Sequence, residues 1–266
     1  MAITISTRGP RKGECNICGN SGQLTEDHTP PKGCVRISQV EMHHIVYRLS
    51  GRNSGTKGRI SQNGVKYRTL CSRCNNSLLG AIYDPELIAF VNEIGTYLKT
   101  NLYLPSNLFV KARPQKIMRS VLGHISAQGV GRYQKGSLTG VLRDYFLDET
   151  LPLPNGIKIY YWLFPFGQQV LIRDAAYVDT RVQQPVAFWL LKFFPLAFMV
   201  TWEEPVGYNF NVHSFDSWRS TPMQDIADLP IRFTPTIHQF WPEAPTGQSV
   251  IMVGQEAVVA FNRPKR

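Results

Sequence analysis

Apolar residues recur at helical spacing after residue 84. They are Leu87, Ile88, Val91, Ile94 and Leu98, and this spacing predicts a helix with one apolar face. Asp84 followed by Pro85 is typical of an N-cap and first turn, so the helix should begin there. Asn75 or Asn76 could cap a short helix just before it. The same periodicity predicts two more helices over residues 114–128 and 138–147.

Continuous apolar runs dominate the later part of the sequence. They cover residues 157–166, 168–178, 185–191, 196–202, 208–215 and 249–254. Runs of this length are typical of strands covered on both faces. Their many aromatic residues could form a platform on which nucleic-acid bases stack, but the continuous runs and their poor alternation favour core packing. Helices followed by a strand-rich sheet predict an α+β fold.

The segment 185–202 is apolar for nearly the length of a transmembrane helix. Lys192 lies near its middle, where a charge costs about 2.5–3.5 kcal/mol on membrane-insertion scales. Pro195 interrupts the segment as well. We therefore expect two buried strands joined near Pro195. The first residues have no long apolar core of the kind a secretory signal needs, so we expect a cytoplasmic protein.

The charge is unevenly distributed along the chain. Residues 1–80 contain twelve Lys or Arg and four Asp or Glu, a difference of +8, whereas residues 81–266 contain seventeen and fifteen, a difference of +2. A basic first part suggests contact with a polyanion, most simply nucleic acid. A solvated basic face explains the same charge. The Gly- and Ser-rich segment 51–58 is either a surface insertion or a loop that touches phosphates.

Five cysteines change the picture further. Four of them form two Cys-x-x-Cys pairs, Cys15 with Cys18 and Cys71 with Cys74. A thiol-redox motif needs only one such pair, whereas two pairs supply the four thiolates of a tetrahedral structural zinc site. We therefore predict one structural Zn²⁺ bound by these four residues. Cys34 is left over, and we expect it to be a small buried thiol.

Between the two cysteine pairs lies the sequence LTEDHTPPKGC, in which Asp27 and His28 are adjacent. The order of a cysteine pair, a strand with Asp-His and prolines after it, and Leu-Cys-x-x-Cys-Asn opening a helix resembles an HNH endonuclease with the zinc-binding ββα-metal core. The resemblance covers about the first third of the chain. It implies an HNH domain over residues 1–100, followed by an α+β domain of unknown role over residues 101–266.

The resemblance also implies roles for single residues. Asp27 and Asn75 occupy the positions that hold the catalytic metal, Mg²⁺ or Mn²⁺, and His28 occupies the position of the general base. An imidazole with an ordinary pKa of ~6.5 can take a proton from water at neutral pH, and oxygen ligands suit these hard cations. Lys32 could contact a phosphate. The implied activity is hydrolysis of DNA phosphodiester bonds, in genome defence or a mobile element.

One feature departs from the family pattern. The family's middle asparagine usually lies about five residues before the second cysteine pair, but here the nearest candidate, Asn63, lies eight residues before Cys71. Asn63-Gly64 is also a hairpin-turn signal, with a strand expected to follow and lead into Cys71.

A second hypothesis belongs to a different class. The chain could be a non-catalytic zinc module that binds nucleic acid or a partner protein, and the second domain could mediate protein contacts or a homo-oligomer. The adjacent Asp27 and His28 favour the enzyme, because a binding module does not need them. His124, on the predicted helix 114–128, is expected to be a satisfied core or surface histidine.

Overall fold

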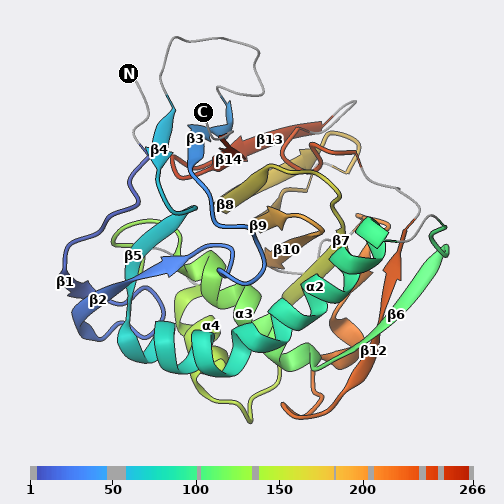
Figure 1. Ribbon diagram of the computed structural model, residues 1–266, viewed down its shortest axis with the longest axis horizontal. Helices are drawn as coiled ribbons and strands as arrows, with labels where there is room; N and C mark the ends of the chain where they lie inside the picture. Colours follow the sequence, from blue (N-terminus) through green and yellow to red (C-terminus); the bar gives the residue numbers. More distant parts are fainter. Residues whose placement is uncertain are drawn as a thin grey trace.

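The computed structural model describes residues 5–46, 58–100, 103–133, 138–182, 184–202, 207–233, 238–244 and 249–263. Within these residues the protein is a mixed α+β structure with few helices and one large sheet (Figure 1). The predicted α+β class is therefore confirmed. Apart from Gly58, the basic segment 51–58 lies outside the described residues.

The first part of the chain forms a small antiparallel sheet followed by a long helical segment. The sheet has the order β1 (Lys12–Glu14), β2 (Ser21–His28), β5 (Lys66–Cys71). The π-helix η1 (Arg73–Tyr83) begins two residues after β5 and continues directly into α2 (Asp84–Thr100). The strand with Asp27 and His28, the strand leading into Cys71 and the helix after it are present as predicted, and two further strands, at residues 40–44 and 59–61, lie between β2 and β5 in the chain.

The beginning of this helical segment differs from the prediction. Asp84 does not cap a separate helix, because its backbone is helical and its N–H donates to the carbonyl of Leu79. The N-cap position belongs to Ser72 rather than to Asn75 or Asn76, and Ser72 makes no side-chain capping hydrogen bond. The carboxylate of Asp84 is used elsewhere, on helix α3, so tertiary contacts override the local capping signal.

Nine of the described strands form the large sheet. Its order is β11-β7-β10-β9-β8-β14-β3-β4, and β13 also pairs with β8. The bounds are β3 (Val40–His44), β4 (Arg59–Ser61), β7 (Ile157–Leu163), β8 (Gln169–Asp179), β9 (Val186–Phe193), β10 (Leu196–Trp202), β11 (His213–Ser214), β13 (Ser249–Val253) and β14 (Val258–Asn262). Five of the six predicted strands are present at nearly the predicted bounds. The run 208–215 yields only the two residues of β11, and β3, β4 and β14 were not predicted.

The apolar segment 185–202 forms the antiparallel pair β9 and β10, which turns at Pro195 as predicted. Lys192 lies in β9 with its side chain fully buried. Its ammonium group donates to the carbonyls of Gln239 and Trp241 and pairs with the carboxylate of Glu243. In the described part of the chain, no helix has both the length and the apolar character needed to cross a membrane.

Helix α3 (Pro114–Ala127) occupies the centre of the molecule, and α4 (Leu138–Leu147) packs beside it (Figure 1). Both match the predicted ranges. Thirteen of the fourteen residues of α3 are buried, because the helix contacts η1 and α2 as well as strands of both the small and the large sheet. A helix covered on all sides must satisfy each of its polar side chains within the protein.

The remaining elements lie at one edge of the molecule. They are the strand pair β6 (Asn107–Ala112) with β12 (Ala227–Arg232), and the short helix η2 (Asp216–Trp218). The main hydrophobic core draws residues from both sides of residue 100, from Ile5 to Ala260. The boundary at residue 100 stays a prediction.

Candidate functional site

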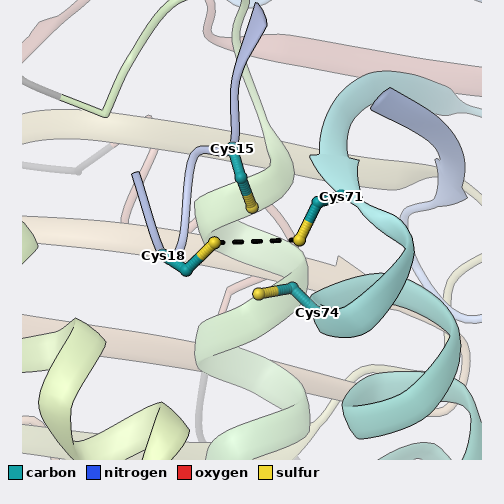
Figure 2. Close-up of side chains that lie close together, drawn as sticks. All are labelled: Cys15, Cys18, Cys71 and Cys74. Atoms are coloured by element: carbon teal, nitrogen blue, oxygen red, sulfur yellow. Dashed lines mark hydrogen bonds between the residues drawn. The ribbon is translucent and has the colours of Figure 1, made fainter. Parts of the chain in front are cut away.

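The four paired cysteines lie together at one end of the small sheet. Their sulfur atoms are all within 4.8 Å of one another, and Figure 2 shows the four side chains pointing toward a common centre. Cys15 and Cys18 come from the turn between β1 and β2, and Cys71 and Cys74 from the junction of β5 and η1. This arrangement is compatible with tetrahedral coordination of structural zinc by four thiolates.

The local chain conformation explains how each pair presents two sulfurs. The N–H of Gly19 donates to the carbonyl of Cys15, which closes a tight turn around the first pair, and Gly19 has a φ of 74° that favours glycine. A hydrogen bond from Cys74 lowers the pKa of Cys15 to about 5. Burial raises the pKa of Cys18 to about 11, and the hydrogen bond with Cys15 raises the pKa of Cys74. The thiolate, which is the form that binds metal, is therefore favoured at Cys15. Cys34 is buried and lies outside the group, and burial raises its pKa.

The cysteine group is fastened to the end of α3. The side-chain amide of Asn16 donates to the carbonyls of Ser126 and Gly129, and the hydroxyl of Thr69 donates to the carbonyl of Ala127. The cysteines pack in an apolar cluster with residues of η1, α3 and α4. The turn that carries Cys15 and Cys18 is thus part of the protein core.

Asp27 lies at the opposite end of the same sheet, near the end of β2. Its side chain is only 4% exposed and faces α3. One carboxylate oxygen, Oδ2, accepts hydrogen bonds from the hydroxyl of Thr29 and from Nδ1 of His124, each at 3.0 Å. The other oxygen, Oδ1, makes no hydrogen bond with the described residues.

His28 follows directly and its side chain is half-buried. Burial lowers its pKa, and the positive charge of Lys66 lowers that pKa further, whereas the charge of Asp27 and the backbone of Asn63 oppose the change. A lowered pKa favours the neutral form of this imidazole at neutral pH. Lys32 is exposed, and its charge also contributes to the lowered pKa of His28.

The Asn63-Gly64 turn lies against this imidazole. A Cβ atom on Gly64 would be 3.9 Å from Cδ2 of His28. The turn is present as predicted, but it is not a hairpin, because β4 pairs with β3 and β5 pairs with β2. The turn carries the chain from the large sheet to the small one.

Asn75 lies in the first turn of η1 and is buried. Its amide nitrogen donates to the hydroxyl of Thr25 at 2.8 Å and to the carbonyl of Glu26 at 3.1 Å. These bonds hold the start of the helix against β2, beside the residue that precedes Asp27. The carbonyl oxygen of the amide makes no hydrogen bond within the described residues.

The sequence did not reveal that His124 contacts Asp27. It is a satisfied core histidine, 1% exposed, with Nδ1 on Asp27 and Nε2 2.9 Å from Oδ1 of Asp84. Burial alone would lower its pKa, but the two carboxylates outweigh burial and raise that pKa to about 10. The available sequence signal was the presence of two polar pairs at i, i+4 spacing on the same helix, Gln115 with Arg119 and Ser120 with His124.

Comparison of the chain with protein-family models, with curated proteins and with solved structures gives no match.

Proposed function

We propose that this protein is a metal-dependent endonuclease of the HNH type that hydrolyses DNA phosphodiester bonds. The observation that carries the proposal is the arrangement of β2, β5 and η1. It brings the Asp27-His28 pair and Asn75 to one end of β2 while the cysteine group closes the other end. In this proposal His28 is the general base, and Asp27 and Asn75 are the ligands of the catalytic metal.

The surroundings of His28 support its role. A general base must be deprotonated before it can accept a proton from water. Burial and the neighbouring lysines keep the pKa of His28 below its ordinary value, so the neutral ring is available.

The free oxygens of Asp27 and Asn75 fit a hard divalent cation. Oδ1 of Asp27 and the amide oxygen of Asn75 both lack hydrogen-bond partners among the described residues, and oxygen ligands are those that Mg²⁺ and Mn²⁺ prefer. When bound, such an ion would polarise a phosphoryl oxygen and stabilise the departing alkoxide. Asp27 and Asn75 would hold it, and His28 would remove the proton from the attacking water.

The charge distribution supports a nucleic-acid substrate. The excess of +8 in residues 1–80 lies in the part of the chain that contains the candidate site. Glu26 pairs with Lys66 and Arg68 on β5, whereas Lys32 is exposed and close enough to affect His28. Lys32 is thus a suitable residue for a phosphate contact.

The test is nicking of supercoiled plasmid by the purified protein with Mg²⁺ or Mn²⁺. His28→Ala should reduce the rate by about 10²–10⁴-fold, as expected for loss of a general base. DNA binding should stay close to wild type, because this change removes proton transfer and no phosphate contact. His238→Ala, which changes an exposed histidine far along the chain, is the matched control and should cut at the wild-type rate. Equal cutting by His28→Ala and wild type would refute the proposal.

One observation favours a second candidate function. Asp27 is buried and already engaged by Thr29 and His124, as expected if the fold has been kept only as a zinc module that binds nucleic acid or a protein. The plasmid experiment separates the two candidates. The module should retain salt-dependent DNA or partner binding and cut nothing with either metal.

A further inference from the structure

Three side chains from separate elements form a continuous buried chain beside the candidate site. The ring of His124, on α3, lies between Asp27 at the end of β2 and Asp84 at the start of α2. Nδ1 is 3.0 Å from Oδ2 of Asp27, and Nε2 is 2.9 Å from Oδ1 of Asp84. Each end of the chain is completed by a hydroxyl, from Thr29 on Asp27 and from Ser120 on Asp84.

The two carboxylate oxygens of Asp27 differ in their hydrogen bonds. Oδ2 accepts two hydrogen bonds, from His124 and Thr29, while Oδ1 accepts none from the described residues. A carboxylate held in this way cannot rotate to offer both oxygens to a ligand. It presents only Oδ1, and the direction of that oxygen is set by the bonds of Thr29 and His124 to Oδ2.

Hydrogen-bonded partners behind a metal ligand commonly set its orientation, and losing one typically lowers metal affinity by about 10–100-fold. We propose that His124 is a positioning residue that holds Asp27 so that Oδ1 faces the catalytic divalent cation. The inference rests on the proposed function, because it assigns Asp27 the role of metal ligand. Asp84 contacts the other nitrogen of the ring, and the bond from Nδ1 to Asp27 is the one that sets the position of Oδ1.

Two substitutions of the same residue test this inference, because each keeps one of the two ring contacts. The amide nitrogen of asparagine occupies nearly the place of Nδ1, so His124→Asn retains the bond to Asp27 and loses the one to Asp84. The amide nitrogen of glutamine corresponds to Nε2, so His124→Gln retains the bond to Asp84 and loses the one to Asp27. Each variant loses one buried contact, so their stabilities should fall by similar amounts.

The measurement is the affinity of zinc-loaded protein for Mn²⁺, by titration calorimetry, with urea unfolding of the same samples. We expect His124→Asn to bind Mn²⁺ within about 3-fold of wild type and His124→Gln to bind it about 10–100-fold more weakly. Plasmid nicking should follow the same order. The Mn²⁺ binding that Asp27→Ala abolishes is the binding assigned to this site.

A second pair of variants tests the same inference if the His124 variants fold poorly. Thr29→Val removes the other hydrogen bond to Oδ2 of Asp27 at nearly constant volume, and Ser120→Ala removes the hydroxyl at the far end, on Asp84. Thr29→Val should weaken Mn²⁺ binding by several-fold. Ser120→Ala should leave it unchanged, because Ser120 does not touch Asp27.

The results separate this inference from the proposed function. Equal Mn²⁺ affinity in His124→Asn and His124→Gln would show that His124 only fills the core, even if the wild-type protein cuts DNA. Absence of any Mn²⁺ binding that Asp27→Ala removes would overturn the inference as well. Conversely, the expected order of Mn²⁺ affinities in a protein that cuts no plasmid would leave the positioning role standing and refute the nuclease.

Discussion

The two ends of the β2–β5 pair carry polar groups of different kinds. At one end four cysteine sulfurs converge, and at the other Asp27 and His28 lie opposite Tyr67 and Lys66. Thiolates repel one another, so the cysteine end needs a cation to be stable in its deprotonated form. The Asp27 end compensates itself, because His124 stands between two carboxylates. The four cysteines need a cation, so their geometry alone points to a metal. The charges of Asp27 and Asp84 are already balanced by His124, so experiments must show whether Asp27 binds a metal as well.

The largest effect should follow from breaking the cysteine end. Cys15→Ser/Cys71→Ser removes one sulfur from each pair, and bound zinc should fall from one per chain to well below that. Structural zinc contributes apparent binding free energies of about 10–16 kcal/mol in zinc-finger peptides, so cooperative unfolding of the surrounding core should be lost. Metal analysis and circular dichroism measure both effects.

Cys34→Ser is the matched control for this double variant. Cys34 is buried but lies outside the four-cysteine group, so its variant should keep a full equivalent of zinc. Undiminished zinc in the double variant would disprove the assignment of these ligands.

Substitutions at the Asp27 end should lower the stability of the protein without unfolding it. Asp84→Ala leaves Nε2 of His124 and the hydroxyl of Ser120 without their partner. Removing one member of a buried ion pair typically costs about 3–5 kcal/mol, and urea unfolding should show a loss of that size without loss of zinc. Glu93→Ala, an exposed acidic residue on the same helix, should change stability by less than about 0.5 kcal/mol. A similarly small change in Asp84→Ala would mean that the buried chain contributes little.

A smaller effect is expected where the helix start meets β2. Asn75→Ala removes two hydrogen bonds, to Thr25 and Glu26, each worth about 1 kcal/mol. If the proposed metal site is correct, Mn²⁺ affinity should also fall, although less than in Asp27→Ala. Asn76→Ala is the control, because Asn76 is exposed and its side chain bonds to Ser72 alone among the residues that the structure describes. Retention of full stability by Asn75→Ala would show that this contact does not hold the helix in place.

The smallest effect concerns the surface next to His28. If Lys32 contacts a phosphate, Lys32→Ala should lower the slope of log affinity for DNA against log salt by about 0.9, the value for one phosphate contact. Lys111→Ala, an exposed lysine on β6, should leave that slope unchanged. Filter binding or fluorescence anisotropy at several salt concentrations measures both slopes. Identical slopes for Lys32→Ala and wild type would remove Lys32 from the interface.

Local patterns predicted most of the elements after residue 100. Helices α3 and α4 and the strand pair β9–β10 appear at nearly the bounds that the apolar residues indicated. Strand β3 was missed because its alternate buried positions are Val40, Met42 and His44, and a buried histidine hides the period of two. The N-cap expected at Asp84 failed for a different reason, since its carboxylate bonds to residues on another helix.

The candidate site also has one part that the sequence predicted and one part that it did not. The cysteine group was predictable because its spacing is a property of two short segments. The link between Asp27 and His124 joins residues 97 positions apart, and no local period encodes such a contact. Only the burial of α3 on all sides forces its polar residues to find partners, and that burial is a property of the folded protein.

The position of β14 in the large sheet has a consequence for synthesis of the chain on the ribosome. Strand β14 lies between β8 and β3 and hydrogen-bonds to both (Figure 1). At about 5–20 residues per second, the 214 positions from His44 to Val258 take roughly 10–40 s to translate. During that time β3 and β4 have no sheet to join, and the apolar side chains of β3 lack their cover. We therefore expect nascent chains stalled before β14 to be captured by chaperones that bind exposed apolar strands.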